Sequence, residues 1–165
     1  MDAPSSTRHT RATPSRRGLL RLLAAAPALA LTATACAGDD DPDPLVRPAR
    51  AAKSDAAQAR AIAQQHPELA EAAEEVDRVR SAHARSLLRE IDRVAPRDPQ
   101  DPSPVPDPPP GRAPGSSEAA SEELRTALHT AQRSAADLAV GLPPNRCGLV
   151  GSVAAGCASL LEVLG

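Results

Sequence analysis

The sequence has no phenylalanine, tyrosine or tryptophan among its 165 residues. Aromatic side chains dominate the energetics of cores and interfaces, so a core of alanine, leucine and valine in a chain this small buries little area per residue and predicts marginal stability. Proteins that bind single-stranded nucleic acid stack bases on aromatic rings, and the formal net charge of −2 supplies no basic surface instead. The composition therefore argues against nucleic acid as a partner.

The sequence also lacks an uninterrupted apolar run of the ~20 residues that a membrane-spanning helix needs. Residues 1–17 are polar and positively charged, and Arg21 limits the apolar run that follows to residues 22–35. This run consists mostly of alanine and closes on Ala33-Thr34-Ala35, an A-x-A cleavage pattern. The pattern predicts a signal peptide over residues 1–35, and a permanent membrane anchor is the alternative.

The segment SRRGLLR, Ser15 to Arg21, resembles the twin-arginine export signal. Arg16 and Arg17 supply the paired arginines, and a spacer, two apolar residues and a basic residue follow them. The resemblance implies export of the protein in a folded state. The alternative is that the two arginines form the positive start of an ordinary secretion signal.

The segment TATAC, Thr32 to Cys36, resembles a bacterial lipobox, although Ala33 stands where that family usually has leucine. The resemblance implies that Cys36 becomes the first residue of the mature protein and carries acyl chains, which would hold it at the outer face of the cytoplasmic membrane. The acidic, proline-containing residues 37–44 that follow are typical of a tether. The alternative is ordinary cleavage after Ala35, which would give a soluble secreted protein.

The mature chain would have 130 residues, enough for one domain, with 14 basic and 20 acidic residues. Helical periodicity predicts four helices, over about 45–65, 67–94, 117–141 and 148–164. Proline-rich residues 95–116 predict an extended, disordered connector that could run the length of the bundle. The pattern predicts an all-α four-helix bundle in a ferritin-like arrangement. The expected core faces are Ala49, Ala52, Ala56, Ala59, Ile62 and Ala63; Val76, Val79, His83, Leu87, Ile91 and Val94; Leu124, Leu128, Ala131, Ala135, Leu138 and Leu142; and Val150, Val153, Cys157, Leu160, Leu161 and Leu164.

Two segments carry a resemblance to a known family. They are HPELAEAAEEVDRVRSAHARSLL, His66 to Leu88, and the closing GLVGSVAAGCASLLEVL, Gly148 to Leu164. Together with the succession of predicted helices separated by prolines, they resemble ferritin-like domains of unknown function in exported lipoproteins of high-GC Gram-positive bacteria. The resemblance covers most of residues 45–164 and implies a ferritin-like bundle.

Metal binding is the chemistry that such a bundle suggests, and the residues argue against it. Ferritin-like sites need Glu-x-x-His pairs, because residues three apart can point a carboxylate and an imidazole at the same ions. Alanine, arginine and threonine precede the three histidines of the helical region by three positions, at Ala63, Arg80 and Thr126. We therefore predict no metal and no other cofactor. In a weak alternative, His83 on the predicted core face of residues 67–94 binds a metal together with carboxylates. The candidate carboxylates are Glu74, Glu75 and Glu162.

Cys147 and Cys157 remain if Cys36 is lipidated, and an oxidising compartment favours a disulfide between two such thiols. Ten residues of one helix span about 15 Å, whereas the Cα atoms of a disulfide lie within about 7 Å. A disulfide therefore requires Cys147 to lie in a loop that folds back on the helix. Otherwise Cys157 is a small core residue and Cys147 an exposed free thiol.

No catalytic constellation surrounds these cysteines or histidines, and we do not expect an enzyme. The sequence predicts a lipid-anchored protein of the cell envelope that serves as a helical interaction or scaffold module. Its partners would be the membrane, through the anchor, and an envelope protein, with self-association as a further way to bury apolar surface. A degenerate ferritin-like metal-binding protein and a soluble secreted protein are the alternatives.

Overall fold

The computed structural model describes residues 42–165, and the regular structure in this range is entirely helical. Export signal, lipobox and Cys36 lie outside the described residues. The elements are α2 (Val46–Gln65), the short 3₁₀ helix η2 (Pro67–Leu69), α3 (Ala70–Val94), α4 (Ser117–Gly141) and α5 (Pro144–Leu164). The prediction of an all-α four-helix bundle is confirmed.

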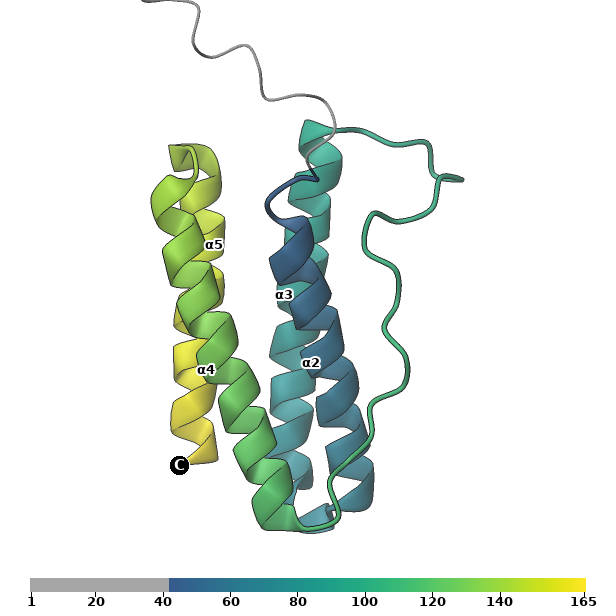
Figure 1. Ribbon diagram of the computed structural model, residues 1–165, viewed down its shortest axis with the longest axis vertical. Coiled ribbons are helices and arrows are strands. Elements are labelled where there is room, and N and C mark those ends of the chain that lie inside the picture. Colours follow the sequence, from purple (N-terminus) through teal and green to yellow (C-terminus); the bar gives the residue numbers. More distant parts are fainter. Residues whose placement is uncertain (1–41) are drawn as a thin grey trace, which may run out of the picture. The chain divides into compact units, whose positions relative to one another are not determined.

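The four helices form two antiparallel hairpins joined by a long crossover (Figure 1). Helices α2 and α3 make the first hairpin, and η2 forms its turn with Pro67 at the first helical position, where a missing N–H costs nothing. Helices α4 and α5 make the second. Residues 95–116 run back along α2, so α4 starts at the end of the bundle where α2 finishes. The predicted run of the connector along the bundle is therefore present.

The connector is ordered against α2, and the prediction of a disordered connector is wrong. Lys53 donates a hydrogen bond to the carbonyl oxygen of Val105 at 2.9 Å, and Val105 is fully buried. Gln58 makes a pair of hydrogen bonds with the backbone of Arg112, at 2.7 and 3.0 Å. Proline removes backbone donors and leaves the carbonyl groups free to accept. Donors on α2 use these carbonyls to hold the extended chain.

The end of the connector that precedes α4 is also held by hydrogen bonds to its carbonyl groups. Nε2 of His66 donates to the carbonyl oxygen of Pro114 at 2.8 Å, and the amide of Gln65 donates to that oxygen at 3.1 Å. Ser116 then caps α4, because its hydroxyl oxygen accepts a hydrogen bond from the backbone N–H of Ala119. His66 lies in the turn between α2 and η2, where it is buried against the connector.

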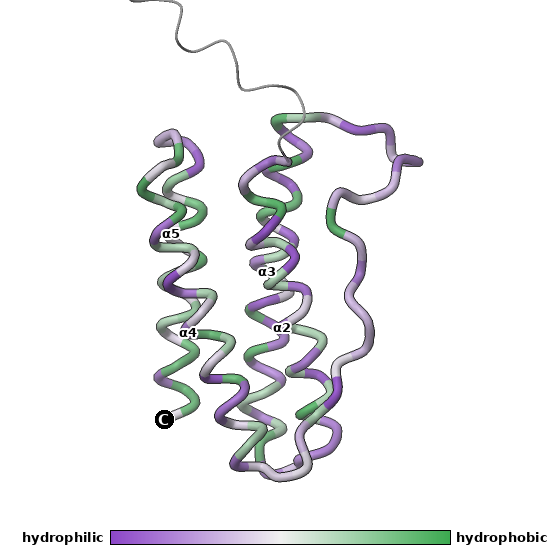
Figure 2. Tube along the Cα trace, viewed as in Figure 1, coloured by the Kyte–Doolittle hydropathy of each residue, from purple (hydrophilic) through white to green (hydrophobic). Residues whose placement is uncertain are grey.

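The core follows the predicted stripes on three helices and departs from them on α3. Figure 2 shows hydrophobic and hydrophilic residues alternating along α2 and α3, as amphipathic helices require. On α3 the predicted Val79 and His83 are half-buried and Val94 is 51% exposed. Val76, Leu87 and Ile91 are buried as predicted, and the buried face is turned slightly toward Arg80 and Ala84 on the helix, which packs against both α2 and α5. The buried face consists of Ala73, Val76, Arg80, Ala84, Leu87 and Ile91.

Helix α5 begins at Pro144, four residues earlier than predicted. Pro144 has a fixed φ that suits the first helical turn. The Pro143-Pro144 pair therefore prevents α4 from continuing and also begins α5. By length and composition α5 is the one helix of residues 42–165 that could cross a membrane. In the bundle it turns a stripe of side chains to the core, Val150, Val153, Cys157 and Leu160.

Candidate functional site

A charged residue, Arg80 of α3, lies at the centre of the bundle with 1% of its surface exposed. Its Nε and Nη2 atoms donate hydrogen bonds of 3.0 and 2.8 Å to the same atom, Oδ2 of Asp55 on α2. A buried guanidinium is tolerated only with a counter-charge and hydrogen-bond partners, because desolvation of a lone charge costs several kcal/mol. Asp55 therefore fixes Arg80, and the pair joins α2 to α3.

The remaining guanidinium nitrogen extends the contact to a third helix. Nη1 of Arg80 lies 3.1 Å from Nδ1 of His83 and 3.4 Å from Sγ of Cys157 on α5. Arginine has only donors, so Nδ1 of His83 accepts and the proton of the neutral imidazole lies on Nε2. We call Asp55, Arg80, His83 and Cys157 the central polar cluster.

The surroundings of the central polar cluster favour uncharged forms of His83 and Cys157. Burial, and then the neighbouring positive charge of Arg80, lower the pKa of His83 to about 4. Burial raises the pKa of the Cys157 thiol, against the opposing effect of Arg80. Burial also raises the pKa of Asp55, and Arg80 opposes this shift by its charge and its hydrogen bonds. At neutral pH the imidazole is therefore neutral and a weak base, and the thiol is protonated.

A groove of about 1090 Å³ lies between α2 and α4 and reaches the Asp55–Arg80 pair of the central polar cluster. Asp55 and Arg80 both line this α2/α4 groove, as does Val153 of α5. Small side chains form much of the α4 wall, and hydroxyl groups accompany them. These residues are Ala127, Ala131, Ala135, Thr126, Thr130 and Ser134.

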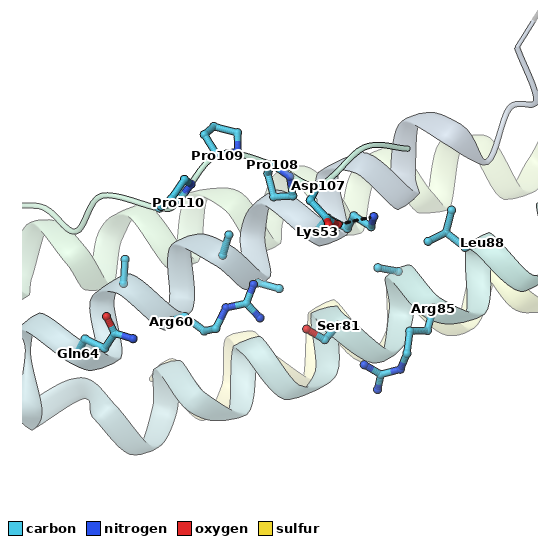
Figure 3. Close-up of a pocket in the computed structure, with 15 residues that line it drawn as sticks. Lys53, Arg60, Gln64, Ser81, Arg85, Leu88, Asp107, Pro108, Pro109 and Pro110 are labelled. Atoms are coloured by element: carbon cyan, nitrogen blue, oxygen red, sulfur yellow. Dashed lines mark hydrogen bonds and ion pairs between the residues drawn. The ribbon is translucent and has the colours of Figure 1, made fainter. Parts of the chain in front are cut away.

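A second cavity, of about 560 Å³, lies between α2, α3 and the connector (Figure 3). Pro108, Pro109 and Pro110 of the connector form one wall. Lys53 in this cavity is paired with a connector carboxylate, Asp107, at 2.8 Å. The cavity is therefore bounded by the contact that holds the connector to α2.

A second buried arginine, Arg146 of α5, holds the start of the described chain. Its Nη2 atom donates to both carboxylate oxygens of Asp43 at 2.7 and 2.8 Å, and its Nε atom lies 3.4 Å from Oε1 of Glu90 on α3. Leu45, two residues after Asp43, is fully buried. The chain is thus anchored to α3 and α5 before α2 begins.

The structure does not bring together the carboxylates that were considered as ligands beside His83. Glu74 and Glu162 are exposed, and Glu75 forms a salt bridge with Arg78. Within residues 42–165 no three His, Cys, Asp or Glu side chains lie close enough to hold a metal ion. The residue one helical turn before His83, where a Glu-x-x-His pair needs a carboxylate, is the buried Arg80.

Cys147 and Cys157 are both free thiols, and both lie on α5. Because α5 starts at Pro144, Cys147 is inside the helix, and the loop that a disulfide would require is not formed. Cys157 is buried, as expected of a small core residue, and Cys147 is half-buried. Cys36 lies outside the described residues.

Sequence reasoning missed Asp55 and Arg146 and took Arg80 only as an obstacle to metal binding. A signal for Arg80 exists, since it stands four residues after Val76 and seven before Leu87, both of them core residues. Nothing local marks Asp55 or Arg146, because their partners are 25 and 103 residues away in the sequence.

The resemblance to ferritin-like domains of exported lipoproteins stays a prediction, since it rests on alanine-rich segments of the sequence. No protein-family model, no curated protein and no solved structure matches the sequence.

Proposed function

We propose that the protein is an exported lipoprotein, held at the outer face of the cytoplasmic membrane by acyl chains on Cys36, and that its helical bundle serves there as a non-catalytic binding or scaffold module. The twin-arginine pattern at Arg16 and Arg17 and the lipobox-like sequence ending at Cys36 support export and lipidation. One acyl chain gives only marginal membrane binding, and two or more give stable anchoring.

The observation that carries the proposal is how closely the bundle follows Cys36 in the sequence. Asp43 is held by Arg146, and Leu45 is fully buried, so residues that belong to the bundle follow Cys36 by only a few positions in the sequence. Such a short acidic segment suits a tether, because its charges and prolines keep it in water. A lipid on Cys36 would therefore hold the bundle close to the membrane surface.

The chemistry of the central polar cluster supports a module without catalysis. A general base works best with a pKa near the working pH, whereas the pKa of His83 is lowered to about 4. A nucleophilic cysteine needs a lowered pKa, whereas burial raises the pKa of Cys157. The hydrogen bonds of Arg80 instead link three helices, which is a structural role.

Replacing Cys36 with serine tests the anchor. We expect the wild-type protein in the membrane fraction and the Cys36→Ser variant in the soluble or secreted fraction. Cys147→Ser is the matched control, since it removes a different thiol, which is half-buried in α5, and this variant should stay with the membranes. Retention of Cys36→Ser in the membrane fraction would contradict the proposal, and release of the wild type itself would favour a secreted protein.

A further inference from the structure

We infer that the α2/α4 groove binds a single-chain amphiphile whose polar group, a hydroxyl or an ammonium, donates a hydrogen bond to Asp55. The inference goes beyond the proposed function and does not depend on lipid attachment at Cys36. It rests on the shape of the groove, on the hydrogen bonds of Asp55 and Arg80, and on the composition of the groove's rim.

The volume of the groove and its walls suit a slender apolar molecule. Its 1090 Å³ is at the upper limit of the roughly 300–1,000 Å³ of small-molecule sites. Ala127, Ala131 and Ala135 recur every four residues along α4, and Ala51 lies on the α2 side. A row of methyl groups leaves room for an alkyl chain and offers it an apolar surface along the helix axis.

Asp55 determines which polar group fits beside it in the groove. Both hydrogen bonds from Arg80 go to Oδ2, and within residues 42–165 the other oxygen, Oδ1, has no hydrogen-bond partner. The Asp55 side chain is 16% exposed and lines the groove. An ionised carboxylate can only accept hydrogen bonds, so the group that faces Oδ1 must be a donor.

Arg80 does not offer the groove an anion site, although it is a cation that lines it. Four of its five N–H groups are used, that of Nε and one of Nη2 by Asp55 and those of Nη1 by His83 and Cys157. A carboxylate or phosphate there would meet the negative charge of Asp55 before any free N–H of Arg80. The cluster therefore selects a hydroxyl or ammonium group against an acidic one.

The rim favours a small molecule over a protein partner. Hydroxyl and charged groups border the groove, among them Thr126, Thr130, Arg50 and Asp137. Protein-binding grooves usually display large exposed apolar side chains. The large hydrophobic residues exposed in residues 42–165 are elsewhere and do not line the groove, namely Val94, Val140 and Val163.

Matched alkyl probes of one chain length test the inference. Residues 42–165 form a compact unit of their own, so the mature chain with Cys36→Ser can be studied in solution. Isothermal titration with 1-decanol, decylamine and decanoate measures affinity and stoichiometry, with decanol kept below its solubility limit and the two charged probes below their micelle concentrations. We expect one equivalent of decanol and of decylamine to bind, and decanoate to bind about tenfold more weakly or less.

Two variants locate the site. Ala131→Leu fills the α4 wall and should weaken binding of all three probes by about tenfold or more, whereas Ala155→Leu, at an exposed position of α5, should leave it unchanged. Asp55→Asn should bring decanoate to within about threefold of decanol. Because Asp55→Asn leaves a buried arginine unpaired and could unfold the chain, the preference among probes and the Ala131→Leu result decide the matter without it.

Several results would overturn the inference. Decanoate binding as tightly as decanol would remove the role of Asp55. Unchanged affinity in Ala131→Leu, or an equal loss in Ala155→Leu, would place the probes outside the groove. Absence of binding by decanol and decylamine, or binding without saturation at one equivalent, would contradict a defined site. Failure here leaves the membrane fractionation of Cys36→Ser unaffected, so the two proposals are tested separately.

Discussion

Gly156 on α5 lies directly against the imidazole of His83 on α3: a Cβ atom at position 156 would be 2.7 Å from Nε2 of that ring. This is closer than real Cβ contacts allow, so an alanine at this position would require the His83 ring to shift. The other nitrogen of the ring, Nδ1, accepts the hydrogen bond from Arg80. Glycine at position 156 therefore leaves the His83 ring in the position where it contacts Arg80.

Gly156→Ala tests this packing, and Gly151→Ala is its matched control on the same helix. A Cβ at Gly151 meets nothing within 4 Å, so alanine there should stabilise the protein by ~0.5–1 kcal/mol through helix propensity. At Gly156 the same gain is opposed by the displaced His83 ring, and we expect Gly156→Ala to be less stable than Gly151→Ala by ~1–3 kcal/mol. Urea denaturation followed by circular dichroism measures both, and equal changes in the two variants would refute the contact. In a His83→Ala background the difference should disappear.

Gly111→Ala tests the order of the connector. A Cβ at Gly111 would lie 2.5 Å from the backbone oxygen of Ala57, which cannot move aside, so the connector must lift from α2. We expect trypsin to cleave after Arg112 several-fold faster in this variant, because cleavage follows local opening. Gly115→Ala, where a Cβ meets nothing within 4 Å, should be cleaved at the wild-type rate. Rapid cleavage after Arg112 in the wild type would show that the connector is not held.

The lowered pKa of His83 makes stability depend on pH in a defined direction. The folded state keeps the imidazole neutral down to pH about 4, whereas an unfolded histidine takes up a proton near pH 6.5. As the pH falls from about 6.5 to about 4, the unfolded state binds the extra proton, and the contribution of His83 to stability is lost.

His83→Gln isolates this effect from the general influence of acid. Allowing for the partial exposure of the ring, the wild type should lose on the order of 2 kcal/mol more free energy of unfolding than His83→Gln between pH 7 and pH 4. Denaturant titrations at several pH values measure the difference. Parallel stability profiles for the two proteins would mean that His83 titrates as it does in water.

Local periodicity was enough to predict most of the bundle. The alanines at positions 49, 52, 56 and 59 form one face of a helix by spacing alone, and they are buried in α2. Leu124 and Leu128 of α4 follow the predicted seam for the same reason. Such patterns are properties of a few consecutive turns and do not depend on the partner helix.

The central polar cluster could not be predicted in this way, because it depends on which helices meet. Arg80 is buried only because Asp55 of another helix neutralises it. The order of the connector likewise depends on side chains of α2, such as Lys53 and Gln58, that reach its carbonyl groups. An arginine alone suggests an exposed side chain, and a proline-rich segment alone suggests disorder. In both cases contacts with another helix give the opposite result.

The chemical state of Cys36 is the most direct test of the account. Intact-mass measurement of the protein purified from its own membranes should give the mass of residues 36–165 increased by that of acyl chains, and fragmentation should place the increase on Cys36. An unmodified chain beginning at residue 36, or a chain that still carries residues 1–35, would contradict the central claim.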